Sequence, residues 1–155
     1  AWSAQAEKLL DFLMTNKIQE AKALINSLLK QFISIRNSGS ELYYHGFMLG
    51  LLGITSSALN TVIKEELESG EGFTDITLIN EDLQKVVIIE MKKASANTPL
   101  GLRQGALAAL DQIKRKDYAR AFINQGYENI LGVGIGFGGK NCAVLSKALN
   151  DEVQD

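Results

Sequence analysis

The stretch that decides the fold is Gly72–Lys92, which reads GFTDITLINEDLQKVVIIEMK. Its two halves, Phe73–Ile79 and Val86–Met91, are rich in the β-branched and apolar residues that are typical of strands. The polar residues 80–82 between them favour a turn. We therefore predict an antiparallel hairpin at this place in the chain.

The hairpin carries two acidic residues that the predicted register brings face to face. If it closes with Asn80 opposite Lys85, then Asp75 lies opposite Glu90. Facing side chains on one side of such a pair have Cβ atoms about 4.5–5.5 Å apart, and like charges there are destabilising. A bound cation would reverse this repulsion, and Lys92 lies on the same face, two residues after Glu90. Two carboxylates and a lysine on one face predict a hydrolytic site.

Length and composition indicate one globular domain. The chain has 155 residues, of which 22% are charged and 46% hydrophobic. Its net charge of -2 does not indicate a polyanionic partner, so any binding of nucleic acid must come from a local basic patch. The single cysteine, Cys142, excludes an internal disulfide, and we expect it to be buried and inert. The single histidine, His45, excludes a zinc site made of several histidines.

The sequence also bears on where the protein works. No apolar run reaches the ~18 residues of a membrane span, and no signal peptide is visible. We therefore expect a cytoplasmic protein without a membrane partner. The chain begins at Ala1 rather than at methionine, so we expect a piece of a larger protein.

Before the hairpin the pattern is mainly helical. Apolar residues at intervals of three and four predict residues 3–32 as one long helix or as two short helices with a break at Asn16. Ser40 is the expected N-cap of a helix over Glu41–Leu52. We interpret Asn60–Leu67 as a strand beside the hairpin, with a helix as the alternative.

After the hairpin, Pro99 opens a predicted helix that runs to about Gln125. Small residues on this helix would let it approach a sheet closely. They are Gly105, Ala106, Ala108 and Ala109. A basic cluster lies near its end and consists of Lys114, Arg115, Lys116 and Arg120. We interpret it either as a solvated face or as a phosphate contact.

Two further strands are predicted, over Asn129–Phe137 and Asn141–Leu145. The first alternates large apolar residues with glycines, so one face is bare and would admit a helix backbone. Gly134, Gly136 and Gly139 spell G-x-G-x-x-G, but no helix start follows them, so we reject a dinucleotide site.

The predicted order α, α, β, β, β, α, β, β defines an α/β fold with a mixed central sheet flanked by helices. We divide this single domain into a helical extension over residues 1–37, a core over 38–145 and a frayed tail over 146–155.

The residues that carry chemistry resemble a known family. An aspartate on one strand, followed by Glu90-x-Lys92 on the next, looks like the PD-(D/E)XK nuclease superfamily, whose restriction-endonuclease-like core is an α-β-β-β-α-β unit. The segment Glu41–Gly46 is similar to the E-x-x-Y-H helix of a bacterial subfamily, and the sequence around Gln112 fits its later pattern. The similarity spans about residues 1–144. One departure is Phe73, which stands where the family usually has arginine. The predicted register places Phe73 opposite Lys92, where its ring would pack on the lysine stem.

The resemblance implies a nuclease that depends on Mg²⁺, with Mn²⁺ as a substitute. Metal ligands would be Asp75, Glu90, the backbone carbonyl of Met91 and Glu41, which offer the hard oxygen atoms that Mg²⁺ prefers. Lys92 would orient or help deprotonate the attacking water, and Gln112 would position water or phosphate. The implied catalytic residues are thus Asp75, Glu90, Lys92 and Gln112.

Four further residues are expected to contact the substrate: His45, Lys114, Arg115 and Tyr118. His45 also fits a hydrogen-bonded helix histidine that packs near the site without a role in it. The implied partner is nucleic acid, and DNA before RNA. The subfamily usually follows an AAA-ATPase-like domain, so fusion to such a domain is among the expectations, and the resemblance allows a homodimer.

Two alternatives to a nuclease stay open. One is a catalytically inactive nuclease-like module that binds nucleic acid or a protein partner without turnover. The other is a structural α/β domain in which Asp75, Glu90 and Lys92 form an ion-pair cluster without metal.

Overall fold

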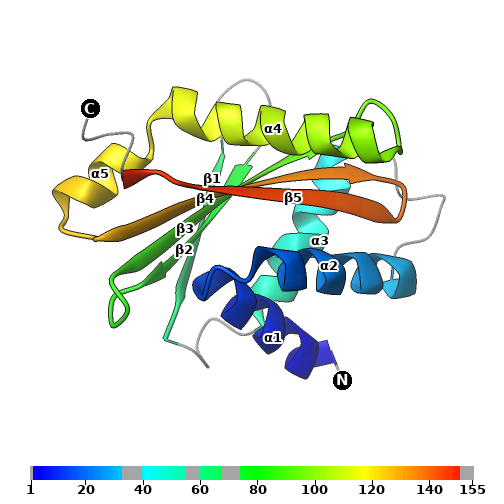
Figure 1. Ribbon diagram of the computed structural model, residues 1–155. Coiled ribbons are helices and arrows are strands. Elements are labelled where there is room, and N and C mark those ends of the chain that lie inside the picture. The colour runs from blue at the N-terminus through cyan, green and yellow to red at the C-terminus, as the bar shows by residue number, and fades with distance from the viewer. Residues whose placement is uncertain (1, 33–39, 55–59, 68–73, 151–155) are drawn as a thin grey trace.

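The computed structural model describes residues 2–32, 40–54, 60–67 and 74–150 (Figure 1). Its helices are α1 (Trp2–Met14), α2 (Ile18–Phe32), α3 (Glu41–Gly53), α4 (Pro99–Lys116) and α5 (Ala119–Asn124). Its strands are β1 (Val62–Leu67), β2 (Thr74–Asn80), β3 (Lys85–Lys93), β4 (Asn129–Gly138) and β5 (Asn141–Ala148).

The strands form one five-stranded sheet in the order β1-β2-β3-β4-β5. Strands β3 and β4 are parallel and the other neighbours are antiparallel. The parallel pair needs a crossover connection, and α4 with α5 supplies it. The predicted mixed sheet flanked by helices is therefore confirmed, including the strand assignment of β1.

Helices cover both faces of the sheet (Figure 1). Helices α1, α2 and α3 share one core cluster with residues of the sheet such as Ile76, Ile89 and Val133. Helices α4 and α5 share a second cluster with Val86 and Ile88. Because successive strand residues point to opposite faces, β3 is buried on both of its sides.

The predicted hairpin is confirmed in its register. Asn80 is the Cα partner of Lys85, and the pairing continues from there to Ile76 and Ile89. Lys85 is buried, and its ammonium donates a hydrogen bond to the Asn16 side chain at the turn between α1 and α2. Burial lowers the pKa of Lys85 from its ordinary value. The N-terminal helices are thus fastened to the hairpin.

Local sequence signals explain the helix ends. Asn16 has a left-handed backbone with φ of 61°, which breaks residues 3–32 into two helices as expected. The Ser40 hydroxyl accepts a hydrogen bond from the Tyr43 N–H at 3.1 Å, which confirms the predicted N-cap. Thr98 caps α4 in the same way, with Pro99 in the first turn.

The glycine face of β4 is where α4 meets the sheet. A Cβ at Gly134 would collide with the carbonyl oxygen of Ala106, and one at Gly136 would collide with that of Leu102. Only glycine permits this approach of helix backbone to strand, as the alternation in the sequence predicted. The close contact fixes the height of α4 above the sheet.

The helix after Pro99 is shorter than predicted. It ends at Lys116, because Asp117 takes a left-handed conformation with φ of 53°. The Asp117 carboxylate accepts a hydrogen bond from Arg120 at 2.7 Å, and the chain then turns into the separate helix α5.

The end of the chain also differs from the expectation. Strand β5 continues to Ala148 rather than stopping at Leu145, and Leu149 is buried against the α5 side of the sheet. Apolar burial of Leu149 orders residues that the sequence assigned to the frayed tail. The remainder of that tail, residues 151–155, lies outside the described residues.

Cys142 is buried, and desolvation raises the pKa of its thiol to about 12, which agrees with an inert cysteine. Within the described ranges, no helix has the length and apolar character needed to cross a membrane.

Candidate active site

The acidic centre lies on the hairpin formed by β2 and β3. The next step of the β2–β3 register beyond Ile76 and Ile89 puts Asp75 opposite Glu90. On the other side of β2, the Cα partner of Asp75 is Glu66 of β1. Asp75 and Glu90 are 2% and 1% exposed. Two carboxylates are therefore buried at neighbouring positions of the sheet.

These residues face α4. Glu90 alternates with Val86 and Ile88, which belong to the core beneath α4 and α5, so it points to the same face. Lys92 follows by two residues and shares this face, and its side chain is partly exposed. Asp75, Glu90 and Lys92 thus share one face of the sheet, as the hairpin register predicted, and this is the face that α4 covers.

Lys116 joins this centre from the last turn of α4. Its ammonium nitrogen lies 3.9 Å from Oε1 of Glu90. Within the part of the chain that the structure describes, Oε2 of Glu90 accepts no hydrogen bond. Helical side chains lean toward the N-terminus of their helix, so a lysine at the end of α4 reaches back over the sheet. The buried carboxylate therefore has a long ionic contact and one unsatisfied oxygen.

The position of Lys116 is visible in the spacing of the residues of this helix. Gly105, Ala109, Gln112 and Lys116 follow one another at intervals of four, three and four, which defines one side of a helix. Gln112 is buried, one turn before Lys116. From the sequence, the basic cluster that includes Lys116 is interpreted either as a solvated face or as a phosphate contact. The spacing from Gln112 instead places Lys116 on the buried side of the helix.

Lys114 and Arg115 have a different position from Lys116. Both side chains are exposed. With about 100° of rotation per residue, Lys114 lies on nearly the opposite side of α4 from Lys116. Tyr118 is half-buried, and the Lys116 ammonium lies 5.8 Å from the centre of its ring, a weak cation–π geometry. Of the three predicted substrate contacts on this side of the chain, Tyr118 lies next to Lys116, whereas Lys114 and Arg115 point to solvent.

Glu41 lies at the C-terminal end of β3, the end that also carries Glu90 and Lys92. Its Oε1 accepts a hydrogen bond from the Lys93 N–H at 3.0 Å. Taken over the residues that the structure describes, no three His, Cys, Asp or Glu side chains are grouped as for a metal ion. The described acidic centre is therefore the pair Asp75 and Glu90, with Glu41 held at the end of the same strand.

His45 lies on the other face of the sheet. It is buried, and its Nε2 is 3.6 Å from Oε1 of Glu65. Glu65 is registered with Ile76, which belongs to the core of α1–α3. Burial lowers the pKa of His45, and the Glu65 carboxylate opposes that shift. The structure therefore does not bring His45 to the face that carries Asp75 and Glu90.

Phe73, which the sequence register places opposite Lys92, lies outside the described residues. Whether its ring packs on the lysine stem stays a prediction.

The fold and the site together define a class. A mixed sheet carries an acidic pair and a lysine on adjacent strands, beneath a helix that packs on a glycine strand, as in restriction-endonuclease-like domains. A family model of the PD-(D/E)XK nuclease superfamily matches residues 39–147, which include Asp75, Glu90, Lys92 and Gln112. The chain belongs to this superfamily. A search of curated proteins finds no match.

Proposed function

We propose that this chain is a metal-dependent nuclease domain that hydrolyses phosphodiester bonds in nucleic acid. Members of the superfamily are in general dependent on divalent metal. The single observation that carries the proposal is the burial of Asp75 and Glu90 at facing positions, with Lys92 on the same face. Burial of two carboxylates at facing positions is costly when both are charged, and a divalent cation would offset that cost.

The donor set fits a hard divalent cation. Asp75 and Glu90 offer carboxylate oxygens, and Oε2 of Glu90 is a buried acceptor that no hydrogen bond in the described residues uses. Mg²⁺ favours a few carboxylate ligands together with water. We assign Asp75, Glu90 and the Met91 carbonyl as the ligands, with Glu41 as an outer ligand and Mn²⁺ as a substitute. When bound, the metal would lower the pKa of a water molecule that it holds and would stabilise the negative charge on the phosphate.

The protein's own groups supply the rest. Lys92 would hold the attacking water by hydrogen bonding and stabilise negative charge on the phosphate oxygens. Gln112, buried on the side of α4 that also carries Lys116, would orient water or a phosphate oxygen. The exposed residues Lys114 and Arg115, with Tyr118, would contact the nucleic-acid backbone, whereas a contact by His45 would require substrate at the other face.

Lys116 extends this assignment. Its ammonium lies near Glu90. With a divalent metal bound at Glu90, the ammonium would either contact a phosphate oxygen of the substrate or stay beside the carboxylate as a counter-ion. The proposal also includes three partners. The substrate would be DNA rather than RNA, the chain would form a homodimer, and it would be fused to an AAA-ATPase-like domain.

A second candidate is a nuclease-like module that binds without turnover. It is favoured by the Lys116–Glu90 contact, since an ammonium near the carboxylate compensates part of its charge without metal. The two candidates differ in metal affinity and in turnover.

Cleavage assays separate them. We expect the full chain to cleave DNA or RNA, single-stranded or duplex, in the presence of Mg²⁺ or Mn²⁺. Glu90→Ala and Lys92→Met should lower the rate by at least about 100-fold, as removal of a charge-stabilising group does elsewhere. Glu81→Ala is the matched control, because Glu81 is exposed in the turn of the same hairpin. Absence of cleavage by the wild type on every substrate would favour the binding module.

A further inference from the structure

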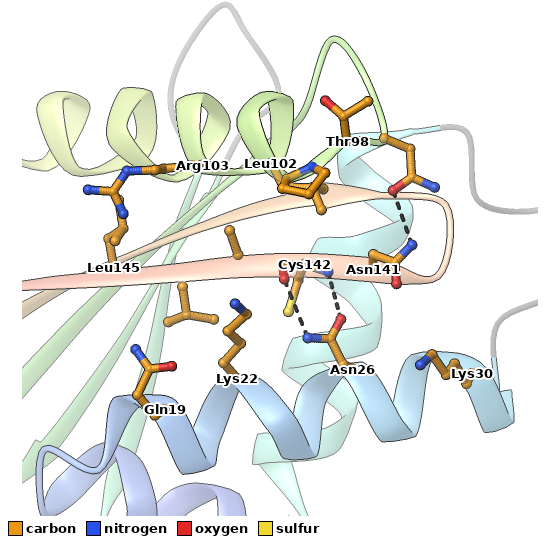
Figure 2. Close-up of a pocket in the computed structure, with 14 residues that line it drawn as sticks. Gln19, Lys22, Asn26, Lys30, Thr98, Leu102, Arg103, Asn141, Cys142 and Leu145 are labelled. Atoms are coloured by element: carbon orange, nitrogen blue, oxygen red, sulfur yellow. Dashed lines mark hydrogen bonds between the residues drawn. The ribbon is translucent and has the colours of Figure 1, made fainter.

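A groove of about 550 Å³ lies along β5, between α2 and the beginning of α4 (Figure 2). Residues 141–145 of β5 form its floor. Leu102 and Arg103 of α4 form one wall. Nine residues at about 100° each put Arg103 on the opposite side of α4 from Gln112. The groove is therefore separate from the candidate active site.

Three cations line this groove. Lys22 and Lys30 come from α2, and Arg103 comes from α4. Among the described lining residues there is no aspartate or glutamate. None of the three cations forms an ion pair with a carboxylate of the described residues. The chain as a whole carries a net charge of -2. The groove is therefore a positively charged region on a protein whose net charge is negative.

Asn26 fixes the orientation of the α2 wall. Its Oδ1 accepts a hydrogen bond from the Cys142 N–H at 2.8 Å, and its Nδ2 donates one to the Cys142 carbonyl at 3.4 Å. Lys22 and Lys30 lie four residues before and after Asn26, so the same side of the helix carries all three. Figure 2 shows Lys22 rising from α2 toward β5, with the Asn26 contacts beside it.

The start of α4 adds to the positive potential. Thr98 and Pro99 line the groove at the N-terminus of an 18-residue helix. The helix dipole places partial positive charge at this end. The groove thus combines three side-chain cations with a favourable helix end.

We propose that this groove binds the phosphodiester backbone of nucleic acid, apart from the candidate active site. The inference rests on the proposed function in taking nucleic acid as the polyanion. Lys22 and Lys30 are eight residues apart, which is about 12 Å along α2 and equals the axial rise of roughly three to four base pairs of a duplex. The described lining has no aromatic side chain on which a base could stack. Contacts should therefore be to phosphate and independent of sequence.

Fluorescence anisotropy with labelled DNA and RNA tests this. The full chain is titrated in EDTA, so that no metal-dependent hydrolysis occurs, with duplex and single-stranded probes over a series of salt concentrations. The Lys22→Gln/Lys30→Gln double variant is compared with Lys8→Gln/Lys17→Gln, which removes the same charge from exposed positions outside the groove.

Each lost phosphate contact lowers the salt slope by about 0.7–0.9, so we expect a decrease of about 1.5 for the groove variant. Its affinity at low salt should fall at least about tenfold, with no change in the control variant. Arg103→Gln, on the other wall, should lower the slope further. The duplex and single-strand arms tell which form of backbone the groove prefers.

Several results would overturn the inference. One is a groove variant that binds like the control variant, and another is a wild type that binds no nucleic acid. A third is a polyglutamate peptide that binds the wild type more tightly than nucleic acid and loses this in the groove variant, which would make the occupant an acidic peptide. Groove-dependent binding in a wild type that never cleaves with Mn²⁺ would instead defeat only the proposed function.

Discussion

The ammonium of Lys116 lies 3.9 Å from Oε1 of Glu90, a carboxylate that is 1% exposed. This distance is too long for a strong hydrogen bond, so the contact is mainly electrostatic. The other oxygen of Glu90 has no hydrogen-bond donor among the described residues. The pair therefore holds a buried negative charge that is only partly compensated, and this is a site where a divalent cation would be stabilised.

Replacement of Lys116 by methionine keeps most of the length of the side chain and removes its charge. We expect Lys116→Met to lower the free energy of unfolding by about 1–3 kcal/mol, because Glu90 loses its cationic neighbour in a buried position. Addition of Mn²⁺ should restore most of the loss. Urea denaturation with and without Mn²⁺ measures both effects.

Lys114→Met is the matched control, since Lys114 is exposed on the same helix. Its effect should stay within about 0.5 kcal/mol. Equal unfolding free energies for the two variants would show that the contact with Glu90 contributes nothing.

The contact between α4 and β4 gives a second prediction. In Gly134→Ala the new Cβ would meet the Ala106 carbonyl and the Leu110 N–H, so α4 must shift away from the sheet. We expect a loss of about 3 kcal/mol in the free energy of unfolding. Thermal and urea unfolding check this value.

Gly46→Ala is its counterpart in an exposed part of α3, where a Cβ meets nothing within 4 Å. Alanine there should stabilise the protein by about 0.5–1 kcal/mol, because it favours the helix over the unfolded chain. The prediction fails if the two alanine variants change stability by similar amounts.

The hairpin register was predictable because it depends on local sequence. Polar turn residues fix the loop, the loop fixes Asn80 opposite Lys85, and the period of two then fixes which residues share a face. Asp75, Glu90 and Lys92 follow from this chain of inference. The bare face of β4 was equally readable, since alternate glycines leave room for a helix.

Other features depend on tertiary packing. The inward direction of Lys116, rather than Lys114 or Arg115, follows from the rotation of α4 on the sheet. The end of α4 depends on the left-handed conformation of Asp117, which a helical pattern that continues through residue 125 conceals. Leu149 is ordered by burial near α5. The position of His45 on the opposite face needed the β1–β2 register.

The buried thiol of Cys142 predicts a dependence of stability on pH. Its pKa is raised from 9.0, the ordinary value, to about 12 in the folded protein, so the folded state binds the proton more tightly. This contribution is complete below about pH 9 and is lost as the pH rises toward 12. Relative to Cys142→Ala, the wild type should lose about 1.5 kcal/mol between pH 7 and pH 10.

Urea denaturation of both proteins over this pH range measures the difference, in which other titrating groups cancel. Parallel curves for the wild type and Cys142→Ala would contradict the assigned burial.

The most direct test of the proposed metal centre is a Mn²⁺ titration of the full chain by calorimetry, beside Glu90→Gln, Asp75→Asn and the control Glu81→Gln. Loss of even an outer partner typically costs about 10- to 100-fold in metal affinity, so both site variants should bind Mn²⁺ at least about tenfold more weakly. Circular dichroism should show that they stay folded. The wild type and Glu81→Gln should bind with equal affinity. Two results would contradict a metal site at Asp75 and Glu90: a wild type that does not bind Mn²⁺, or a Glu90→Gln variant that binds Mn²⁺ as tightly as the wild type.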